Sequence, residues 1–108
     1  MKDAEFGIWA SMEARPGKEA AAREFLTEAA ERLCAEKGTL HFFAMDLGER
    51  QFAIFNVFED AVAVDAHVNG RTAQWVVEQR EDLFVSEYDI SKAKMIATKS
   101  AFANQASE

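Results

Sequence analysis

The stretch Phe55–Arg71, FNVFEDAVAVDAHVNGR, begins as a β-strand and ends as an α-helix. Its opening residues continue an apolar run that is typical of a strand, and the spacing from Asp60 to Gly70 is typical of a short helix. Asp60 stands where an N-cap is expected, because its carboxylate can accept a hydrogen bond from an early backbone N–H of the helix. His67, one of two histidines in the chain, falls within this helix.

The residues before this stretch predict a β-hairpin. Thr39–Leu47 and Gln51–Glu59 are apolar strands joined by the turn sequence Gly-Glu-Arg. Both strands are apolar on both faces, whereas one face of an antiparallel sheet usually meets water. We therefore expect the chain's own helices to cover one face and a second copy of the molecule to cover the other, with about 800 Å² buried per subunit.

The N-terminal part of the chain predicts a strand and then a long amphipathic helix. Glu5–Ala14 alternates between two faces, and Pro16 and Gly17 end that strand and precede the helix. Gly38 is a plausible C-cap. The apolar stripe of the helix consists of Ala22, Phe25, Leu26, Ala29, Ala30, Leu33 and Cys34. Because Cys34 falls on this stripe, we expect a buried, inert thiol.

The C-terminal part adds a helix and a last strand. Arg71–Phe84 has Ala73, Val76, Val77, Arg80 and Phe84 at helical spacing, and Ser86–Lys99 is the expected strand. The order β-α-β-β-α-β predicts the ferredoxin-like, or split βαβ, fold of the α+β class, with a four-stranded antiparallel sheet. We expect one domain over residues 1–98 and a weakly ordered tail over 99–108.

The composition excludes several classes of function. A net charge of −7 has the wrong sign for nucleic acid or an anionic membrane surface. The single cysteine allows neither an intramolecular disulfide nor a thiolate metal site, and no other metal-binding spacing is present. No window approaches 18 consecutive apolar residues, so we expect no membrane segment and a cytoplasmic protein.

Three stretches carry a resemblance to a known family: ARPGKEAAAREFL, GTLHFFAMDL and FAIFNVFEDAVAVDAH. They are similar to the antibiotic biosynthesis monooxygenase family of small dimeric α/β barrels, over roughly Phe6 to Met95. The family often has an aromatic residue, an Asp, a small residue and a His at the spacing of Phe58, Asp60, Ala63 and His67. Where the family usually has a Glu before this motif, the chain has Asn56, and Asn-Gly-Arg stands in place of a Pro-His pair.

The resemblance implies a homodimer that binds a small aromatic molecule between sheet and helices. Some members of the family are oxygenases that use no cofactor and act on quinols or polyketide phenols. The expected function is therefore cofactor-independent monooxygenation of a phenol- or quinol-type substrate. The alternative is a dimeric barrel of the same fold that binds a small molecule, or serves under stress, without catalysis.

His67 and Asn56 are the candidate catalytic residues. His67 shares a helix face with Val64 and Val68, so it can point between the helices and the sheet as a general base or a hydrogen-bond donor. The alternative is a histidine that closes the pocket and bonds a carbonyl. Asn56 lies among aromatic residues on its strand, where a buried amide needs a partner. That partner is either a ligand or a neighbouring side chain.

Four further residues are candidates for binding the substrate: Phe58, Trp75, Arg71 and Trp9. Arg71 opens the third helix and can pair with an anionic group. The two tryptophans either line the pocket or serve ordinary packing. His41, on the second strand, is expected to have a cross-strand or interface role.

Overall fold

The computed structural model describes residues 4–85 and 89–99 of the 108-residue chain. Its elements follow the order β1 (Phe6–Glu13), α1 (Glu19–Leu33), β2 (Thr39–Gly48), β3 (Gln51–Phe58), α2 (Ala61–Val68), α3 (Arg71–Leu83) and β4 (Asp89–Lys94). The strands form one four-stranded antiparallel sheet in the order β2-β3-β1-β4. This confirms the predicted ferredoxin-like fold of the α+β class.

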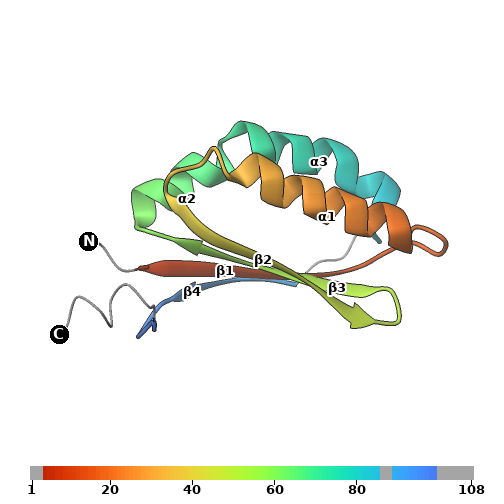
Figure 1. Ribbon diagram of the computed structural model, residues 1–108, viewed down its shortest axis with the longest axis horizontal. Coiled ribbons are helices and arrows are strands. Elements are labelled where there is room, and N and C mark those ends of the chain that lie inside the picture. Colours follow the sequence, from red (N-terminus) through yellow and green to blue (C-terminus); the bar gives the residue numbers. More distant parts are fainter. Residues whose placement is uncertain (1–3, 86–88, 100–108) are drawn as a thin grey trace.

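The molecule has two layers, with all the described helices on one face of the sheet (Figure 1). α1 and α3 run side by side above the strands, and α2 covers the end of the sheet where β3 leaves it. The opposite face of the sheet is covered by no described helix or strand. The two faces of the same strands therefore meet different surroundings.

Strand pairing assigns each side chain to one of these faces. β1 and β3 pair so that Ile8 lies opposite Asn56 and Met12 opposite Phe52, and these residues face the helices. Because side chains alternate along a strand, their sequence neighbours face away. This second face, called the rear face below, carries Gly7, Trp9, Ser11, His41, Phe43, Met45, Ala53, Phe55, Val57, Ser91 and Ala93.

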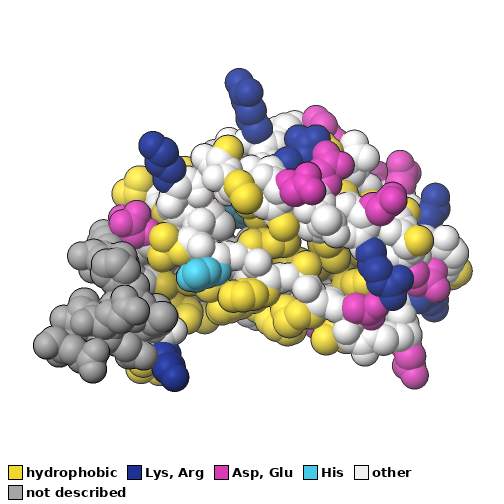
Figure 2. All heavy atoms as spheres, viewed as in Figure 1, with side chains coloured by type: hydrophobic (Ala, Val, Ile, Leu, Met, Phe, Trp, Pro, Cys, Tyr) yellow, Lys and Arg dark blue, Asp and Glu magenta, His cyan; other side chains and the backbone are white. Residues whose placement is uncertain are grey.

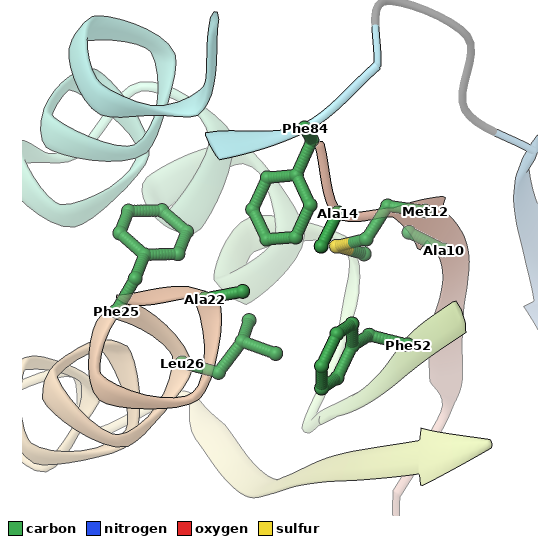
Figure 3. Packing of buried hydrophobic residues seen from close by; sticks show 8 residues of the cluster. All are labelled: Ala10, Met12, Ala14, Ala22, Phe25, Leu26, Phe52 and Phe84. Atoms are coloured by element: carbon green, nitrogen blue, oxygen red, sulfur yellow. The ribbon is translucent and has the colours of Figure 1, made fainter. Parts of the chain in front are cut away.

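The main hydrophobic core lies on the helix-covered face, as Figure 3 shows. The rings of Phe25 of α1 and Phe84 after α3 lie side by side, and Leu26 of α1 points toward Phe52 of β3. The ring of Phe84 is 1% exposed and packs edge-on against Phe25, with 5.8 Å between the ring centroids. The buried members of the cluster are Ala10, Met12, Ala14, Ala22, Phe25, Leu26, Phe52 and Phe84. Each large side chain buried in this way contributes about 1.5–3 kcal/mol to folding.

The start of α2 is set by a side-chain cap, as predicted. Asp60 Oδ1 accepts a hydrogen bond from the backbone N–H of Ala63 at 2.9 Å. Gly38 was expected to cap α1, but that helix already ends at Leu33. Gly38 instead lies where α2 approaches β2, because a Cβ at this position would stand 2.5 Å from the Cβ of Ala63. Only glycine lets α2 come this close.

The start of α1 agrees with the sequence, whereas the expectation for Cys34 is wrong. The helix begins at Glu19, and Pro16 lies in the preceding turn, which Lys18 N–H closes by donating to Arg15 O at 2.9 Å. Cys34 is exposed rather than buried. The buried stripe of α1 ends at Leu33, so the next residue is turned away from the sheet.

The last strand ends earlier than the sequence pattern indicated, and residues 86–88 of the expected strand lie outside the described residues. β4 ends at Lys94 because that residue pairs with Phe6, the first residue of β1. Beyond it, Met95 N–H donates to Glu5 O at 2.8 Å and regular pairing stops. The predicted tail, 99–108, lies outside the described residues apart from Lys99.

The rear face carries large apolar side chains in contact with solvent. Trp9 is 37% exposed and Phe43 is 51% exposed. Phe55 lies over Gly7, since a Cβ on that glycine would stand 2.5 Å from the Phe55 ring. These side chains make the rear face apolar, as the sequence predicted.

No helix in the part of the chain described here is both long and apolar enough to cross a membrane.

Candidate functional site

A cavity of about 300 Å³ lies between the sheet and the helices. Its floor consists of strand side chains: Ile8, Ala10, Met12, Phe42, Ile54, Asn56 and Ile90. Its roof and ends are formed by Phe25, Leu26, Ala29, Leu33, His67, Val68, Thr72, Ala73, Val76, Val77, Arg80 and Phe84. Figure 2 shows hydrophobic side chains gathered between the helix layer and the sheet. The volume is at the lower end of the range for small-molecule sites.

At one end of the cavity, the C-terminal end of α3 is tied to the sheet. Arg15 N–H donates to Leu83 O at 2.8 Å, and Val85 N–H donates to Glu13 O at 2.9 Å. These bonds hold the end of α3 beside the end of β1, where Phe84 closes the cavity. Further along, the walls include the small side chains Ala10, Ala29 and Ala73, which leave space between the layers.

Three exposed apolar side chains mark the mouth of the cavity. Val68 is 51% exposed, Val77 is 54% exposed and Ile90 is 62% exposed, and all three line the cavity. They come from α2, α3 and β4 respectively. The cavity therefore opens to solvent between the last strand and the two later helices.

Asn56 is buried in the floor of this cavity. The residue is 3% exposed, and its Oδ1 has no hydrogen-bond partner among residues 4–85 and 89–99. A buried acceptor left without a partner costs about 1–3 kcal/mol. The sequence indicated a buried amide that needs a partner, and the described residues do not supply one to this oxygen.

His67 lies at the α2 end of the cavity and is paired with a carboxylate. Its Nδ1 is 2.8 Å from Oε1 of Glu36, and the two side chains are 16% and 20% exposed. Thr39 Oγ1 donates to the same carboxylate oxygen at 2.8 Å. Glu36, in the turn between α1 and β2, was missed by sequence reasoning, because nothing local relates it to a histidine 31 positions away.

Asn56 and His67 are near each other in the fold. The buried ring of Phe58 has its centroid 5.0 Å from that of His67. Phe58 is two positions after Asn56 on the same face of β3, a distance of about 7 Å along a strand. Both the amide and the imidazole line the same cavity.

Two further polar side chains line the cavity. Thr72, at the start of α3, is 7% exposed, and Arg80 lies half-buried further along the same helix. Sequence reasoning noted Arg80 on the apolar stripe of α3 but did not assign it to the site. An arginine among apolar residues at helical spacing was the available signal.

The other predicted binding residues are not in the cavity lining. Trp9 belongs to the rear face, and Arg71 is exposed at the start of α3. Trp75 stacks on Phe25 at 4.7 Å between ring centroids, and the guanidinium of Arg32 lies 4.1 Å from the centroid of the Trp75 ring. Phe58 is fully buried beneath α2. A substrate contact for these residues stays a prediction.

The second histidine is on the other side of the sheet. His41 of β2 is exposed on the rear face, where its ring stacks with Phe43 at 6.0 Å between centroids. Within the described residues, no group of three or more His, Cys, Asp or Glu side chains is arranged to hold a metal ion.

A second hollow, of about 360 Å³, lies between α1 and β2 and shares Leu26 and Phe42 with the cavity. An ion pair between Arg23 and Asp46 spans it. The hydrogen bond from Arg23, followed by one from the backbone N–H of Gly48, lowers the pKa of Asp46 below its usual value. These charges stand at the edge of the sheet and outside the main cavity.

Comparisons with known proteins agree with this architecture. Residues 6–79 match the profile of a family described as antibiotic biosynthesis monooxygenase. A search of functionally curated proteins gave no match.

Several solved structures share the fold. A protein of unknown function from Nitrosomonas europaea is 33% identical, covers 90% of this chain and 94% of its own length, and has a TM-score of 0.84. Rv0793 from Mycobacterium tuberculosis is 16% identical over 89% of this chain and 99% of its own, with a TM-score of 0.79. A protein from Deinococcus radiodurans, described as a candidate antibiotic biosynthesis monooxygenase, is 18% identical over 88% and 96%, with a TM-score of 0.78.

Proposed function

The chain belongs to the antibiotic biosynthesis monooxygenase family, and from this membership we propose that it oxygenates a small, electron-rich phenol or quinol without a cofactor. The substrate occupies the cavity between the sheet and the helices. His67 is the proposed general base, and Asn56 binds and orients the substrate. The substrate supplies the electrons that reduce O₂.

The unpartnered Oδ1 of Asn56 is the observation that carries this proposal. A hydroxyl group on a bound ring would donate the hydrogen bond that the described residues do not provide. An apolar ligand with no donor would leave the acceptor buried and unpaired, so the site discriminates against it. The chemistry that fits the floor of the cavity is therefore an aromatic ring bearing a hydroxyl group.

His67 supplies the proton transfer that such a substrate needs. Removal of a proton from the phenol or quinol gives an anion with carbanion character at a ring carbon. This carbon transfers one electron to O₂, and the resulting radical pair combines to form a C–O–O⁻ peroxide. The peroxide takes back the proton held on His67, and cleavage of the O–O bond with loss of the carbon-bound hydrogen as a proton then leaves a carbonyl and one water. One O₂ is consumed, and all four electrons come from the substrate.

The apolar walls of the cavity have a role in this scheme. They surround the anion and the peroxide with few groups that can donate protons, which limits side reactions of the intermediates with water. The ring of Phe58 packs beside the imidazole and holds it at the α2 end of the cavity.

The test is oxygen uptake by the purified protein with a panel of quinols and anthrones. Wild type is expected to consume one O₂ per product, and His67→Ala to lower kcat/KM by about 100-fold or more. His41→Ala is the matched control, because that histidine lies on the rear face. If wild type and His67→Ala are equally inactive across the panel, the proposal is wrong.

The alternative, a binding protein without catalysis, is favoured by one observation. Among the described residues that line the cavity, only four side chains are polar and none is a carboxylate: Asn56, His67, Thr72 and Arg80. Such a site can hold an aromatic molecule through burial and one hydrogen bond. Raised thermal stability with a hydroxylated aromatic compound, together with no oxygen uptake, would support this function instead.

We also propose that the protein is a homodimer formed through the rear face. Trp9 and Phe43 expose large apolar surfaces there, and a monomer rarely leaves such a continuous patch in water. Packing two sheets face to face would remove this surface from solvent in both copies.

A further inference from the structure

We infer that Glu36 is a positioning residue for His67: its carboxylate holds the imidazole with the proton on Nδ1, so that Nε2 is the free base of the site. The catalytic consequence of this inference rests on the proposed function. The tautomer itself does not, and it can be measured whether or not the protein is an enzyme.

The hydrogen bond defines the tautomer. Nδ1 of His67 lies 2.8 Å from Oε1 of Glu36. An ionised carboxylate can only accept hydrogen bonds, so the proton of this bond must belong to Nδ1. A neutral imidazole has one N–H, and Nε2 then carries the lone pair. A histidine with this tautomer can take a proton only through Nε2.

The carboxylate is itself held in place by the turn that carries it. Thr39 Oγ1 donates to the same Oε1 at 2.8 Å. The backbone N–H of Glu36 donates to Leu33 O at 2.9 Å, and Thr39 N–H donates to Glu36 O at 3.2 Å. The side chain and the backbone of this turn are therefore both constrained.

The absence of a side chain at Gly38 brings the two partners within reach. Any Cβ at position 38 would stand 2.5 Å from the Cβ of Ala63, so only glycine lets α2 approach the beginning of β2. His67 lies one turn further along α2 and thereby reaches the turn that carries Glu36. A glycine expected to cap a helix thus has a different role, which is to place a base beside its carboxylate.

The pair is also suited to the charge that develops during proton transfer. When Nε2 accepts a proton, the imidazole becomes a cation directly beside the Glu36 carboxylate. Both side chains are largely shielded from solvent, at 16% and 20% exposure, so their attraction is screened less than that of a surface pair. Proton transfer to Nε2 therefore places the imidazolium 2.8 Å from a carboxylate oxygen.

The first experiment is a long-range ¹H–¹⁵N NMR correlation spectrum of the wild-type full chain, recorded under conditions where His67 is neutral. We expect a protonated Nδ1 and an unprotonated Nε2 for His67. His41 serves as the internal comparison, because no carboxylate contact holds it among the described residues. A protonated Nε2 in His67 would overturn the inference without any measurement of activity.

The second experiment compares Glu36→Gln with Glu31→Gln, an exposed position in the last turns of α1. In Glu36→Gln we expect a mixture of tautomers or the opposite one, because an amide can donate to Nδ1 as well as accept from it. With a substrate that wild type turns over, the kcat of Glu36→Gln should fall at least about 10-fold while its KM changes little. Glu36→Asp keeps the carboxylate charge on a side chain that is one methylene shorter. Its kcat should lie between the values for wild type and Glu36→Gln.

The outcomes separate the inference from the proposed function. If wild type has no oxygenase activity but His67 shows the expected tautomer, which Glu36→Gln alters, the proposed function fails and the positioning role stands. If Glu36→Gln only lowers thermal stability, and leaves kcat and the tautomer as in wild type, Glu36 merely links the turn to α2 and the inference is wrong.

Discussion

The two faces of the sheet have similar apolar compositions but opposite surroundings. One histidine lies on each side of the sheet. His67 reaches the helix-covered face, where it is 16% exposed and bonded to a carboxylate. His41 lies on the rear face, exposed and stacked on Phe43. The helix-covered face also holds the buried amide of Asn56, whereas the rear face presents Trp9 and Phe43 to solvent.

This difference shows that covering a face changes what its polar groups can do. Under the helices, water does not compete for the polar groups. An unpaired acceptor or a histidine held in one tautomer therefore favours a ligand that supplies the matching hydrogen bond. On the rear face, water satisfies polar groups and only the apolar area remains to drive association. This difference is the basis on which we propose chemistry for the first face and self-association for the second.

The largest expected effect is on the closed end of the helix-covered face. Phe84→Ala removes a ring that is 1% exposed between Phe25 and β1, so the free energy of unfolding should fall by about 3–5 kcal/mol. Val62→Ala is the control, because Val62 is 76% exposed on α2 and should change little. Urea denaturation measures both. Equal losses would mean that this end of the cavity is not closed by packing.

The next prediction tests the rear face. Phe43→Glu places a charge in the proposed dimer contact, so the dimer dissociation constant should rise by about 30-fold or more, equivalent to about 2 kcal/mol. Light scattering after gel filtration measures the mass. Val62→Glu, on the helix layer, should leave the dimer intact. A wild type that is monomeric at micromolar concentration would remove the basis for assigning association to this face.

A smaller effect on stability, of opposite sign, is expected at Asn56. Asn56→Leu replaces a buried acceptor that lacks a partner among the described residues with an apolar side chain of similar size, so unfolding should cost about 1–3 kcal/mol more. Binding of hydroxylated aromatic compounds should weaken in the same variant. Thermal denaturation and calorimetric titration measure the two effects, with Asn69→Leu as the exposed control. A destabilised Asn56→Leu protein would show that Oδ1 is already satisfied.

The smallest expected effect is on the pKa of Asp46, at the β2 edge of the sheet. Arg23→Gln should raise the pKa of Asp46, because the strongest hydrogen bond that lowers it is lost, while the bond from Gly48 N–H keeps it somewhat depressed. A folded-state pKa below the unfolded value stabilises the protein above the unfolded pKa, and this contribution disappears as pH falls through the folded pKa. A carboxyl ¹³C titration measures the shift.

The control for that titration is Arg32→Gln, because Arg32 pairs with Glu28 within α1 and not with Asp46. Its Asp46 titration curve should coincide with that of wild type. If Arg23→Gln also leaves the curve unchanged, Arg23 does not hold this carboxylate in solution.

The fold was largely predictable because its elements are encoded locally. The stripe of α1, the two apolar hairpin strands and the cap at Asp60 are each visible within a short window of sequence. The errors at Cys34 and Gly38 have one cause, since α1 ends earlier than its periodicity indicates. A helix end depends on where the chain must turn to reach the next strand, and that is a tertiary constraint.

The candidate site was predictable only in part. His67 and Asn56 stood out as polar residues in apolar segments, and both line the cavity. Arg80 is likewise a polar residue in an apolar segment, on α3, but it was not predicted as a site residue. Trp75 was a candidate for the site, but its ring stacks on Phe25 and contacts Arg32 between α1 and α3.

By itself, the sequence determined the order of elements, the fold class and the apolar character of both sheet faces, since hydrophobic periodicity and capping act between neighbouring residues. Only the tertiary structure decided that Glu36 meets His67, that Asn56 Oδ1 finds no partner among the described residues, and that the space above it stays open. These properties depend on how close separate elements approach one another, and spacing along the chain carries no information about that distance.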